Sequence, residues 1–269
     1  MTSQSFSIVT ISFNQAEFLP RAIHSVLQQF DVDLEYIIVD PGSRDDSRKL
    51  ITELAPQAKH LFEPDQGPAD GLNKGFALAT GDIFGYLNSD DEFLPHTLKH
   101  VAETFRTTNA DVVIGHSEVI DPSGRRLRRS FSDFPEPKAI VYGAAVQMQP
   151  STFIRRSAFQ AVGGFNKDNK IAWDGELILD LALKGAKFFM IDEVLSRYRV
   201  HPTSITGTGK LADLRRSYSR RKFEKVLGRP YCWYDDYIRY LYLVRKYMRD
   251  PRALVERLRY GPVFGIYPQ

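Results

Sequence analysis

The sequence predicts an α/β fold, with a mainly parallel sheet flanked by helices and a helical C-terminal extension. Up to residue 121, short β-branched apolar runs alternate with segments whose apolar residues recur at helical spacing. Strands that alternate with helices favour right-handed crossovers, which make neighbouring strands parallel. A chain of 269 residues with 43% hydrophobic and 26% charged residues has the composition of one large or two small globular domains.

The expected strands are the short runs rich in Val, Ile and Phe, at 6–14, 34–40, part of 59–67, 82–91 and 110–121. The expected helices occupy 16–29, a segment that begins at 48, 68–81 and 94–108. Asp46 or Ser47 is expected to cap the second of these helices.

The regular alternation ends at residue 121. Residues 122–140 are typical of a loop or hairpin with a basic stretch. Residues 151–165 suggest a strand, a short helix and a Gly-Gly stop, and residues 174–192 a helix, Gly185 and a strand.

Charge divides the chain into two parts. Residues 1–205 carry a net charge of −6, whereas residues 206–269 carry +9. A terminal helix is expected with an apolar stripe and with basic residues off that stripe. The stripe consists of Tyr234, Ile238, Leu241 and Val244, and the basic residues are Arg239, Arg245, Lys246 and Arg249. We expect this helix to pack on the body with its charges in water; contact with anionic lipid and homodimerisation are the alternatives.

Several classes of protein are disfavoured. The single cysteine, Cys232, excludes an intramolecular disulfide framework and a cysteine zinc cluster. The first residues show no signal peptide, and no apolar run is long enough to cross a bilayer. A nucleic-acid-binding function would explain the basic C-terminal region but not acidic residues gathered on a sheet rim, which repel phosphates. A sugar nucleotidyltransferase should have a glycine-rich loop after its first strand, and "TISFNQAEF" contains no glycine.

Acidic and amide side chains follow two of the expected strands. Asp40 ends the second strand, and "NSDDE", residues 88–92, ends a later one. Because parallel strands place their carboxyl ends on one rim, and ligands bind there, these residues define a candidate site. Three consecutive acids raise each other's pKa unless positive charge is near. They indicate either a solvated turn or a divalent-cation site.

Five motifs in order give the chain a resemblance to a known family. They are "SIVTISFNQAEFLPRAIHSVLQQ", "IIVDPGSRDDS", "EPDQGPADGLNKGFALATGDIFGYLNSDDEFLP", "GGFNKD" with "WDGELILDLALKG", and "YRVHPTSIT". Together they resemble the glycosyltransferase family 2 enzymes, which have the GT-A fold, a Rossmann-like sheet, and use nucleotide-sugar donors. The resemblance covers residues 6–206. It implies a catalytic domain over 1–206, with a nucleotide-sugar half at 1–121 and an acceptor half at 122–206, followed by a basic, aromatic-rich helical region at 207–269.

The resemblance implies a Mn²⁺ or Mg²⁺ cofactor. "NSDD" stands where the family has its metal-binding Asp-x-Asp motif, with Asn88 in place of the first acid. Hard cations prefer carboxylate, water and phosphate oxygens. The implied metal ligands are Asp90, Asp91 and His201. The implied donor contacts are Asn14, Asp40, Asp65, Asn73, Lys74, Asn88, Ser89, Asp90 and Arg199.

For Asp40 the family role is a contact with the nucleotide base, and the alternative is an ordinary turn-initiating Asp. Asp174 matches the family's catalytic base, with Glu176 as the fallback, although an N-cap also suits an Asp that opens a helix. Trp173 is expected either to stack on a sugar or to pack in the core.

The implied reaction is inverting transfer of a sugar from a UDP- or GDP-linked donor to a hydroxyl of a glycan or lipid-linked acceptor. By resemblance, the setting is bacterial polysaccharide or lipopolysaccharide synthesis, in the cytoplasm or peripherally on the inner face of the cytoplasmic membrane. A catalytically inactive nucleotide-sugar-binding protein and a sugar nucleotidyltransferase are the alternatives.

Overall fold

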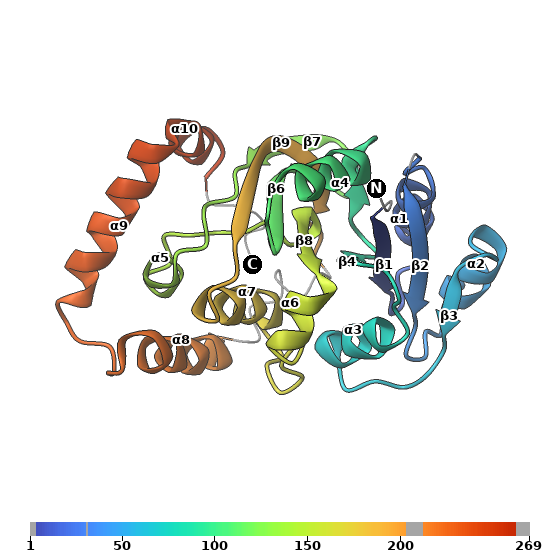
Figure 1. Ribbon diagram of the computed structural model, residues 1–269, viewed down its shortest axis with the longest axis horizontal. Coiled ribbons are helices and arrows are strands. Elements are labelled where there is room, and N and C mark those ends of the chain that lie inside the picture. Colours follow the sequence, from blue (N-terminus) through green and yellow to red (C-terminus); the bar gives the residue numbers. More distant parts are fainter. Residues whose placement is uncertain (1–3, 31, 203–211, 262–269) are drawn as a thin grey trace.

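The computed structural model describes residues 4–30, 32–202 and 212–261, and it shows one sheet covered by helices on both faces (Figure 1). The strand order is β3-β2-β1-β4-β8-β6-β9-β5, and β7 pairs with β6. One apolar core lies between the sheet and α1, α2 and α4, and a second lies between the other face and α3, α6 and α7. The described chain is therefore a three-layer α/β structure.

The first four strands in spatial order form the parallel part of the sheet. These are β1 (Ser5–Ile11), β2 (Asp33–Val39), β3 (Lys59–Leu61) and β4 (Ile83–Asn88). The rest of the sheet is mixed. The strand β8 runs antiparallel to both β4 and β6, β7 runs antiparallel to β6, and β5 runs antiparallel to β9. The strands β6 and β9 are parallel. These strands are β5 (Glu92–Phe93), β6 (Val112–Ile120), β7 (Arg126–Ser130), β8 (Thr152–Arg155) and β9 (Phe188–Arg199).

The described residues contain several helices, and those expected over 16–29, 68–81 and 94–108 are shorter than these segments. The helices are α1 (Leu19–Leu27), α2 (Ser47–Leu54), α3 (Pro68–Ala77), α4 (Thr97–Thr107), α5 (Pro137–Val141), α6 (Arg156–Ala161), α7 (Trp173–Leu183), α8 (Ala212–Leu227), α9 (Asp235–Arg249) and α10 (Pro251–Tyr260). Asp46 occupies the cap position of α2, but its side chain makes no capping hydrogen bond. Asp45 accepts one from the backbone N–H of Ser47 at 3.0 Å instead.

The helices α8, α9 and α10 lie along one end of the molecule, at the opposite end from β2 and β3 (Figure 1). None of the helices in the described ranges is long and apolar enough to cross a bilayer. The expected apolar stripe on α9 is wrong in part: Ile238 packs on the body, but Leu241 and Val244 are exposed. Tyr242 contacts the body instead. Arg245 and Lys246, which were expected in water, also contact the body, because its acidic residues pair with them.

Candidate functional site at the carboxyl rim of the sheet

Three strands end together at the candidate site. Ile11 of β1 is paired with Val39 of β2 on one side and with Asn88 of β4 on the other. The next residues, Ser12 and Asp40, therefore emerge side by side at the rim, with the Asn88 turn beside them. The structure thus brings the two acidic segments together, as the sequence predicts for parallel strands.

Asp40 is fully buried, yet one of its carboxylate oxygens is unused. Its Oδ1 accepts hydrogen bonds from the backbone N–H of Gly42 at 3.0 Å and of Ser43 at 2.8 Å, and from Arg48 Nε at 2.9 Å. Its Oδ2 has no hydrogen-bond partner in the described part of the chain. A buried carboxylate oxygen left without a partner is costly, so this atom marks a place for a ligand that donates a hydrogen bond.

Ser12 is a site residue that the sequence analysis missed. It is buried, and its Oγ is also without a hydrogen-bond partner among the described residues. Its backbone N–H donates to the carbonyl of Val39 at 2.9 Å, which holds it against the end of β2. The available signal was its position, since a hydroxyl residue directly follows an apolar strand at the same rim as Asp40.

Asn14 joins the loops that follow β1 and β2. Its backbone N–H donates to Ser43 Oγ, and its Oδ1 accepts from the backbone N–H of Arg44, both at 2.8 Å. Its φ is +53°, a left-handed conformation that Asn tolerates better than most residues. The implied donor residue Asn14 therefore fixes the loop beside Asp40.

The run of three acids is divided among different partners. Asp90 Oδ2 lies 2.9 Å from His201 Nε2, and the ring of His201 packs against Phe18 with centroids 4.9 Å apart. The Asp90 side chain retains partial exposure, whereas His201 is buried. Asp90 is thus the acid of this run that pairs with His201 at the rim.

Asp91 is buried, and both of its carboxylate oxygens lie against hydrogen-bond donors. Oδ1 accepts from the backbone N–H of Arg199 at 2.9 Å, and Oδ2 lies 3.4 Å from Asn88 Nδ2, which also donates to Gln149 Oε1 at 2.9 Å. Burial, followed by the charge of neighbouring Asp90, raises the pKa of Asp91 well above its ordinary value. Ser89 is also buried, and its N–H donates to the carbonyl of Ile11 at 3.2 Å. These contacts fix the shape of the turn.

Arg199 lies beneath this turn with a fully buried side chain. Its guanidinium pairs with Glu92 and donates to the carbonyl oxygens of Asp90 at 2.8 Å, Asp121 at 2.9 Å and Pro122 at 3.0 Å. The implied phosphate contact of Arg199 gains no support from this position. The guanidinium instead holds the backbone of the acidic turn.

The chemistry of the rim fits a divalent cation with few protein ligands. Within the described ranges, no group of three or more His, Cys, Asp and Glu side chains is placed to hold a metal. Asp90 and His201 together offer one carboxylate oxygen and one imidazole nitrogen. Mn²⁺ accepts both ligand types, and cations that serve phosphate groups take most of their ligands from phosphate and water. Asp91 fits this role less well, since both its oxygens already accept hydrogen bonds or face a donor.

The loop before α3 presents a helix N-terminus to the same side of the sheet. Asp65 is half-buried and accepts from the N–H of Gly67 at 2.8 Å. Burial, reinforced by Asp70, raises its pKa. A Cβ at Gly71 would lie only 2.6 Å from Asp65 Oδ2, so glycine is required for this approach. Lys74 Nζ donates to the carbonyl of Pro64 at 2.5 Å, which places it on this loop.

Asn73 is not brought to the donor-facing side. Its Nδ2 donates to the carbonyl of Phe165 at 2.8 Å, and its Oδ1 accepts from the N–H of Phe165 at 2.9 Å. The side-chain amide therefore ties α3 to the segment before α7. In the same region Lys170 Nζ donates to the carbonyl of Gln66 at 2.6 Å. The two halves of the expected catalytic domain meet through these contacts.

Asp174 lies in the first turn of α7, whose cap position is held by Ala172. Burial raises the pKa of Asp174, which brings the group nearer to the range of a working base. Glu176 is committed elsewhere, because it accepts from Asn169 Nδ2 at 2.6 Å and Asn166 Nδ2 at 3.2 Å. Trp173 is buried against Tyr86 and Phe165, which is the packing role rather than the sugar-stacking role.

Tyr218 of α8 is a second residue that the sequence analysis missed. It is buried, and its hydroxyl has no hydrogen-bond partner in the described part of the chain. It lines a cavity of about 460 Å³ with Glu176 and Asn166. Burial raises its pKa, as do the carboxylates of Glu176 and Asp174, so the phenol lies near the first turn of α7. No sequence pattern distinguished this tyrosine from the other twelve, since the chain contains 13.

The fold is that of the GT-A glycosyltransferases, and comparison with known proteins shows the family. Residues 7–163 match the family described as Glycosyl transferase family 2. The uncharacterized glycosyltransferase alr2836 of Nostoc sp. is 33% identical over 72% of this chain. The match spans 64% of the Nostoc protein, which is less than two thirds of its length. The chain belongs to glycosyl transferase family 2.

A second relative and two solved structures extend the comparison. The succinoglycan biosynthesis protein ExoO of Rhizobium meliloti is 30% identical over 45% of this chain and 36% of its own length. S. aureus TarS 1-349 in complex with UDP-GlcNAc superposes with a TM-score of 0.67 and 15% identity, over 96% of this chain and 73% of TarS 1-349. The mannosyltransferase PcManGT from Pyrobaculum calidifontis, in complex with GDP-Man and Mn²⁺, gives 0.63 and 16%, over 97% and 76%. These structural likenesses establish the GT-A-type fold.

Proposed function

We propose that the protein transfers a sugar from a nucleoside-diphosphate donor to a hydroxyl of a glycan or lipid-linked acceptor, with inversion at the anomeric carbon. The observation that carries this proposal is the buried, unpartnered Oδ2 of Asp40 at the carboxyl rim. The N–H groups of a uracil or guanine ring would satisfy this oxygen, and Ser12 Oγ beside it supplies a second polar group. The solved structures with UDP-GlcNAc and with GDP-Man have the same fold and bind donors of these two kinds.

The diphosphate would lie between the Asp90 turn and the N-terminus of α3. Asp90 and His201 would hold Mn²⁺ or Mg²⁺, which neutralises the diphosphate as it leaves when bound there. The free backbone N–H groups at the start of α3 favour an anion at the same place. Asp65 and Lys74 contact the loop before α3. Asn14 fixes the loop that follows β2.

Asp174 would act as the general base. A single inverting displacement needs one base to take the proton of the acceptor hydroxyl as it attacks. Asp174 has a carboxylate whose pKa is raised by burial, and no described side chain forms a salt bridge with it. Glu176, the fallback, already accepts two amide hydrogen bonds. Asp174 is therefore the better assignment.

The proposed setting is bacterial polysaccharide or lipopolysaccharide assembly in the cytoplasm, peripheral to the inner face of its membrane. The succinoglycan biosynthesis relative supports a polysaccharide product. A catalytically inactive, donor-binding relative is the second candidate, because Asn88 replaces an acid of the metal motif. Hydrolysis of a bound donor in the presence of Mn²⁺ would distinguish an enzyme from a binding protein.

The test is a thermal-shift and calorimetric panel with UDP-GlcNAc, UDP-glucose and GDP-mannose, with and without Mn²⁺. At least one donor should raise the melting temperature, and more so with the metal. Asp40→Asn keeps the oxygen that closes the turn but replaces Oδ2 with an N–H donor. This variant should weaken the preferred nucleotide by about 10- to 100-fold, the loss of a hydrogen bond to a charged group.

Asp46→Asn is the matched control, since Asp46 is an exposed acid of the same loop whose side chain makes no capping bond. It should bind as the wild type does. If no donor stabilises the protein with either Mn²⁺ or Mg²⁺, the donor assignment is wrong. Equal loss in both variants would show that Asp40 acts only through the loop.

A further inference from the structure

One face of α9 is apolar, aromatic and exposed. Its members recur at helical spacing along the outer side of the helix, beginning two residues before it. They are Trp233, Tyr237, Tyr240, Leu241, Val244 and Met248. Trp233 is 76% exposed, Tyr237 69% and Met248 79%, which are large values for such side chains. We refer to these six residues as the aromatic face; a contiguous apolar surface of this kind marks an interaction site.

The inner face of α9 determines that the aromatic face points outward. Ile238 and Tyr242 pack against Tyr142, whose ring stacks on that of Tyr242 with centroids 5.1 Å apart. Tyr142 also donates from its hydroxyl to Asp235 Oδ1 at 2.9 Å, at the start of α9. These buried contacts fix the rotation of the helix about its axis.

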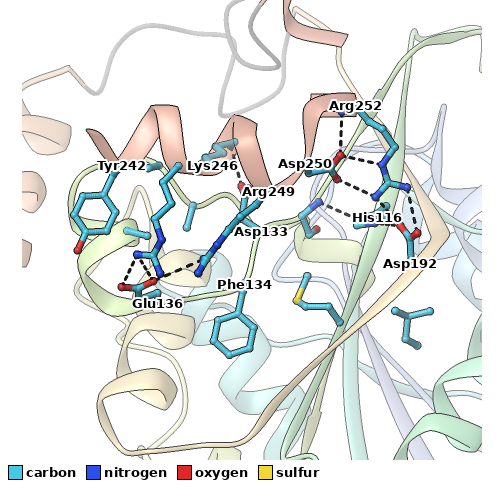
Figure 2. A pocket seen from close by; sticks show the side chains of 17 residues that line it. His116, Asp133, Phe134, Glu136, Asp192, Tyr242, Lys246, Arg249, Asp250 and Arg252 are labelled. Atoms are coloured by element: carbon cyan, nitrogen blue, oxygen red, sulfur yellow. Dashed lines mark hydrogen bonds and ion pairs between the residues drawn. The ribbon is translucent and has the colours of Figure 1, made fainter. Parts of the chain in front are cut away.

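Ion pairs at the cavity between α9, α10 and the body hold the same orientation (Figure 2). This cavity has a volume of about 340 Å³. Lys246 Nζ lies 2.8 Å from Asp133 Oδ2, and Arg245 lies 3.0 Å from Glu136 Oε2. On α10, Arg252 lies 2.8 Å from Asp192 of β9. The cations on this side of the helices are paired with the body, so the aromatic face is left to an external partner.

Exposed basic residues of α9 and α10 add positive charge to this end of the molecule. Among the described residues, no ion pair involves Arg239 of α9, or Arg257 and Arg259 of α10, and all three are exposed. Leu258, exposed by 76%, lies between the last two. The whole region 206–269 has a net charge of +9 against −6 for the rest of the chain. The partner that complements this surface is therefore anionic and apolar together.

We propose that the aromatic face, with Arg257 and Arg259 of α10, docks the protein on the anionic surface of a lipid bilayer. Trp and Tyr side chains, which combine an apolar ring with a polar tip, suit the level of the lipid headgroups. Helices of this composition lie in the plane of the interface, and nearby basic residues add attraction to anionic lipid. A second copy of the chain fits less well, because a symmetric pairing through α9 would bring two regions of charge +9 together.

The docking surface lies at the opposite end of the molecule from β1, β2 and β3, so docking leaves the donor rim open (Figure 1). The proposal does not rest on the donor assignment. It supplies a role for Arg257 and Arg259, which are exposed and form no ion pair among the described residues.

The test is flotation of the full chain with vesicles of phosphatidylcholine containing phosphatidylglycerol, and with vesicles of phosphatidylcholine alone. The protein should float with the anionic vesicles and much less with the neutral ones. The fluorescence of Trp233 should shift to the blue and be quenched by brominated lipid. The other tryptophan, Trp173, is buried, so Trp233→Phe should abolish both signals.

Tyr237→Ser and Leu241→Ser should each reduce the partition coefficient by about tenfold, because each removes an apolar group from the interface. Arg257→Gln and Arg259→Gln should each reduce it by about fivefold on anionic vesicles only. Phe30→Ser, which removes an aromatic ring that is 65% exposed and lies outside α9, is the matched control and should float as the wild type does.

Two results would overturn the proposal. One is equal flotation of the wild type and the Tyr237→Ser variant on anionic vesicles. The other is a concentration-dependent dimer, seen by light scattering, that Tyr237→Ser abolishes while the wild type fails to bind vesicles. Because nucleotide titration is not used, failure here leaves the proposed donor binding untouched.

Discussion

At the scale of single residues, adjacent acids have different environments. Asp90 pairs with His201, Asp91 is buried against the backbone of Arg199, and Glu92 pairs with the Arg199 side chain. The sequence has no cation within the acidic run, and it predicts either a solvated turn or a metal site. The partners of these acids come instead from the end of β9 and from the residues just after it, more than a hundred residues later. The chemistry of each acid therefore depends on a strand pairing that the local sequence does not specify.

The role of Asp174 can be tested at the same scale. Asp174→Asn should reduce the turnover of acceptor by about 10²- to 10⁴-fold while donor affinity is unchanged, because the variant lacks the base but not the donor pocket. Burial raises the pKa of Asp174 above its ordinary value. The rate should therefore fall as the pH falls through that raised pKa, since the protonated carboxyl cannot accept a proton.

Stopped assays of sugar transfer across a pH series, paired with calorimetry of donor binding, would measure both effects. Glu176→Gln is the comparison variant. It retains an oxygen for Asn166 and Asn169 and should keep most of the activity. Full activity of the Asp174→Asn variant would show that Asp174 is not the catalytic base.

At the scale of elements, β9 holds the acidic turn in place. Its residues pair with β6 along most of its length and with β5 at Glu92 and Phe93. Arg199 at its end is fully buried beneath the turn, and Arg197 two residues earlier reaches the same Glu92 from a more exposed position. This long strand therefore links β6 to the acidic turn at residues 88–92.

Arg199→Met should lower the free energy of unfolding by about 3–5 kcal/mol, because it leaves the largely buried Glu92 carboxylate without its buried partner. Arg197→Met should cost about 1 kcal/mol or less, since Arg197 is 41% exposed and lies 3.5 Å from Glu92. Urea unfolding of both variants measures the difference. Similar losses in the two would show that burial of Arg199 carries no special weight.

At the scale of the whole molecule, Glu35 of β2 connects the strands β1, β2 and β3, which lie at the edge of the sheet away from β9. It accepts hydrogen bonds from Ser7 of β1, from Lys59 Nζ of β3 at 2.5 Å, and from the backbone N–H of Thr80 before β4 at 2.7 Å. Burial alone would raise the pKa of Glu35, but these donors together lower it to about 2. The carboxylate thus ties three of the four parallel strands to the turn after α3.

A folded pKa below the ordinary 4.5 means that this stabilisation is present above that pH and is lost as the pH falls toward about 2. Glu35→Gln should therefore lower the stability at neutral pH by about 2 kcal/mol. It should have little effect near pH 2, where the wild type has lost the same contribution. Thermal melts over an acid series would check this, with the exposed Glu53→Gln as control. A constant difference across the series would contradict the linkage.

The sequence by itself determined the order of strands and helices up to residue 121, apart from the two-residue β5, together with the rim that gathers Asp40 and Asn88–Asp91 and, by resemblance, the membership in glycosyl transferase family 2. The element order and the rim follow from local apolar periodicity and from the rule that parallel strands end on one side, whereas the family membership rests on the resemblance of five motifs. The sequence also determined that the C-terminal region is basic and aromatic. Short-range pattern contains this information because each strand or helix buries its own apolar face.

Only the tertiary structure decided which acid faces the rim, that Arg199 lies beneath the turn, and that the buried hydroxyls of Ser12 and Tyr218 lack hydrogen-bond partners among the described residues. It also decided which side of α9 is covered, and it corrected the stripe predicted through Leu241 and Val244. Each of these depends on contacts between residues far apart in the chain, such as Arg199 with Glu92 and Lys246 with Asp133. The helix α9 has apolar residues on two sides and could pack on the body through either side. The ion pairs of its cations with Asp133 and Glu136 determine which side faces the body.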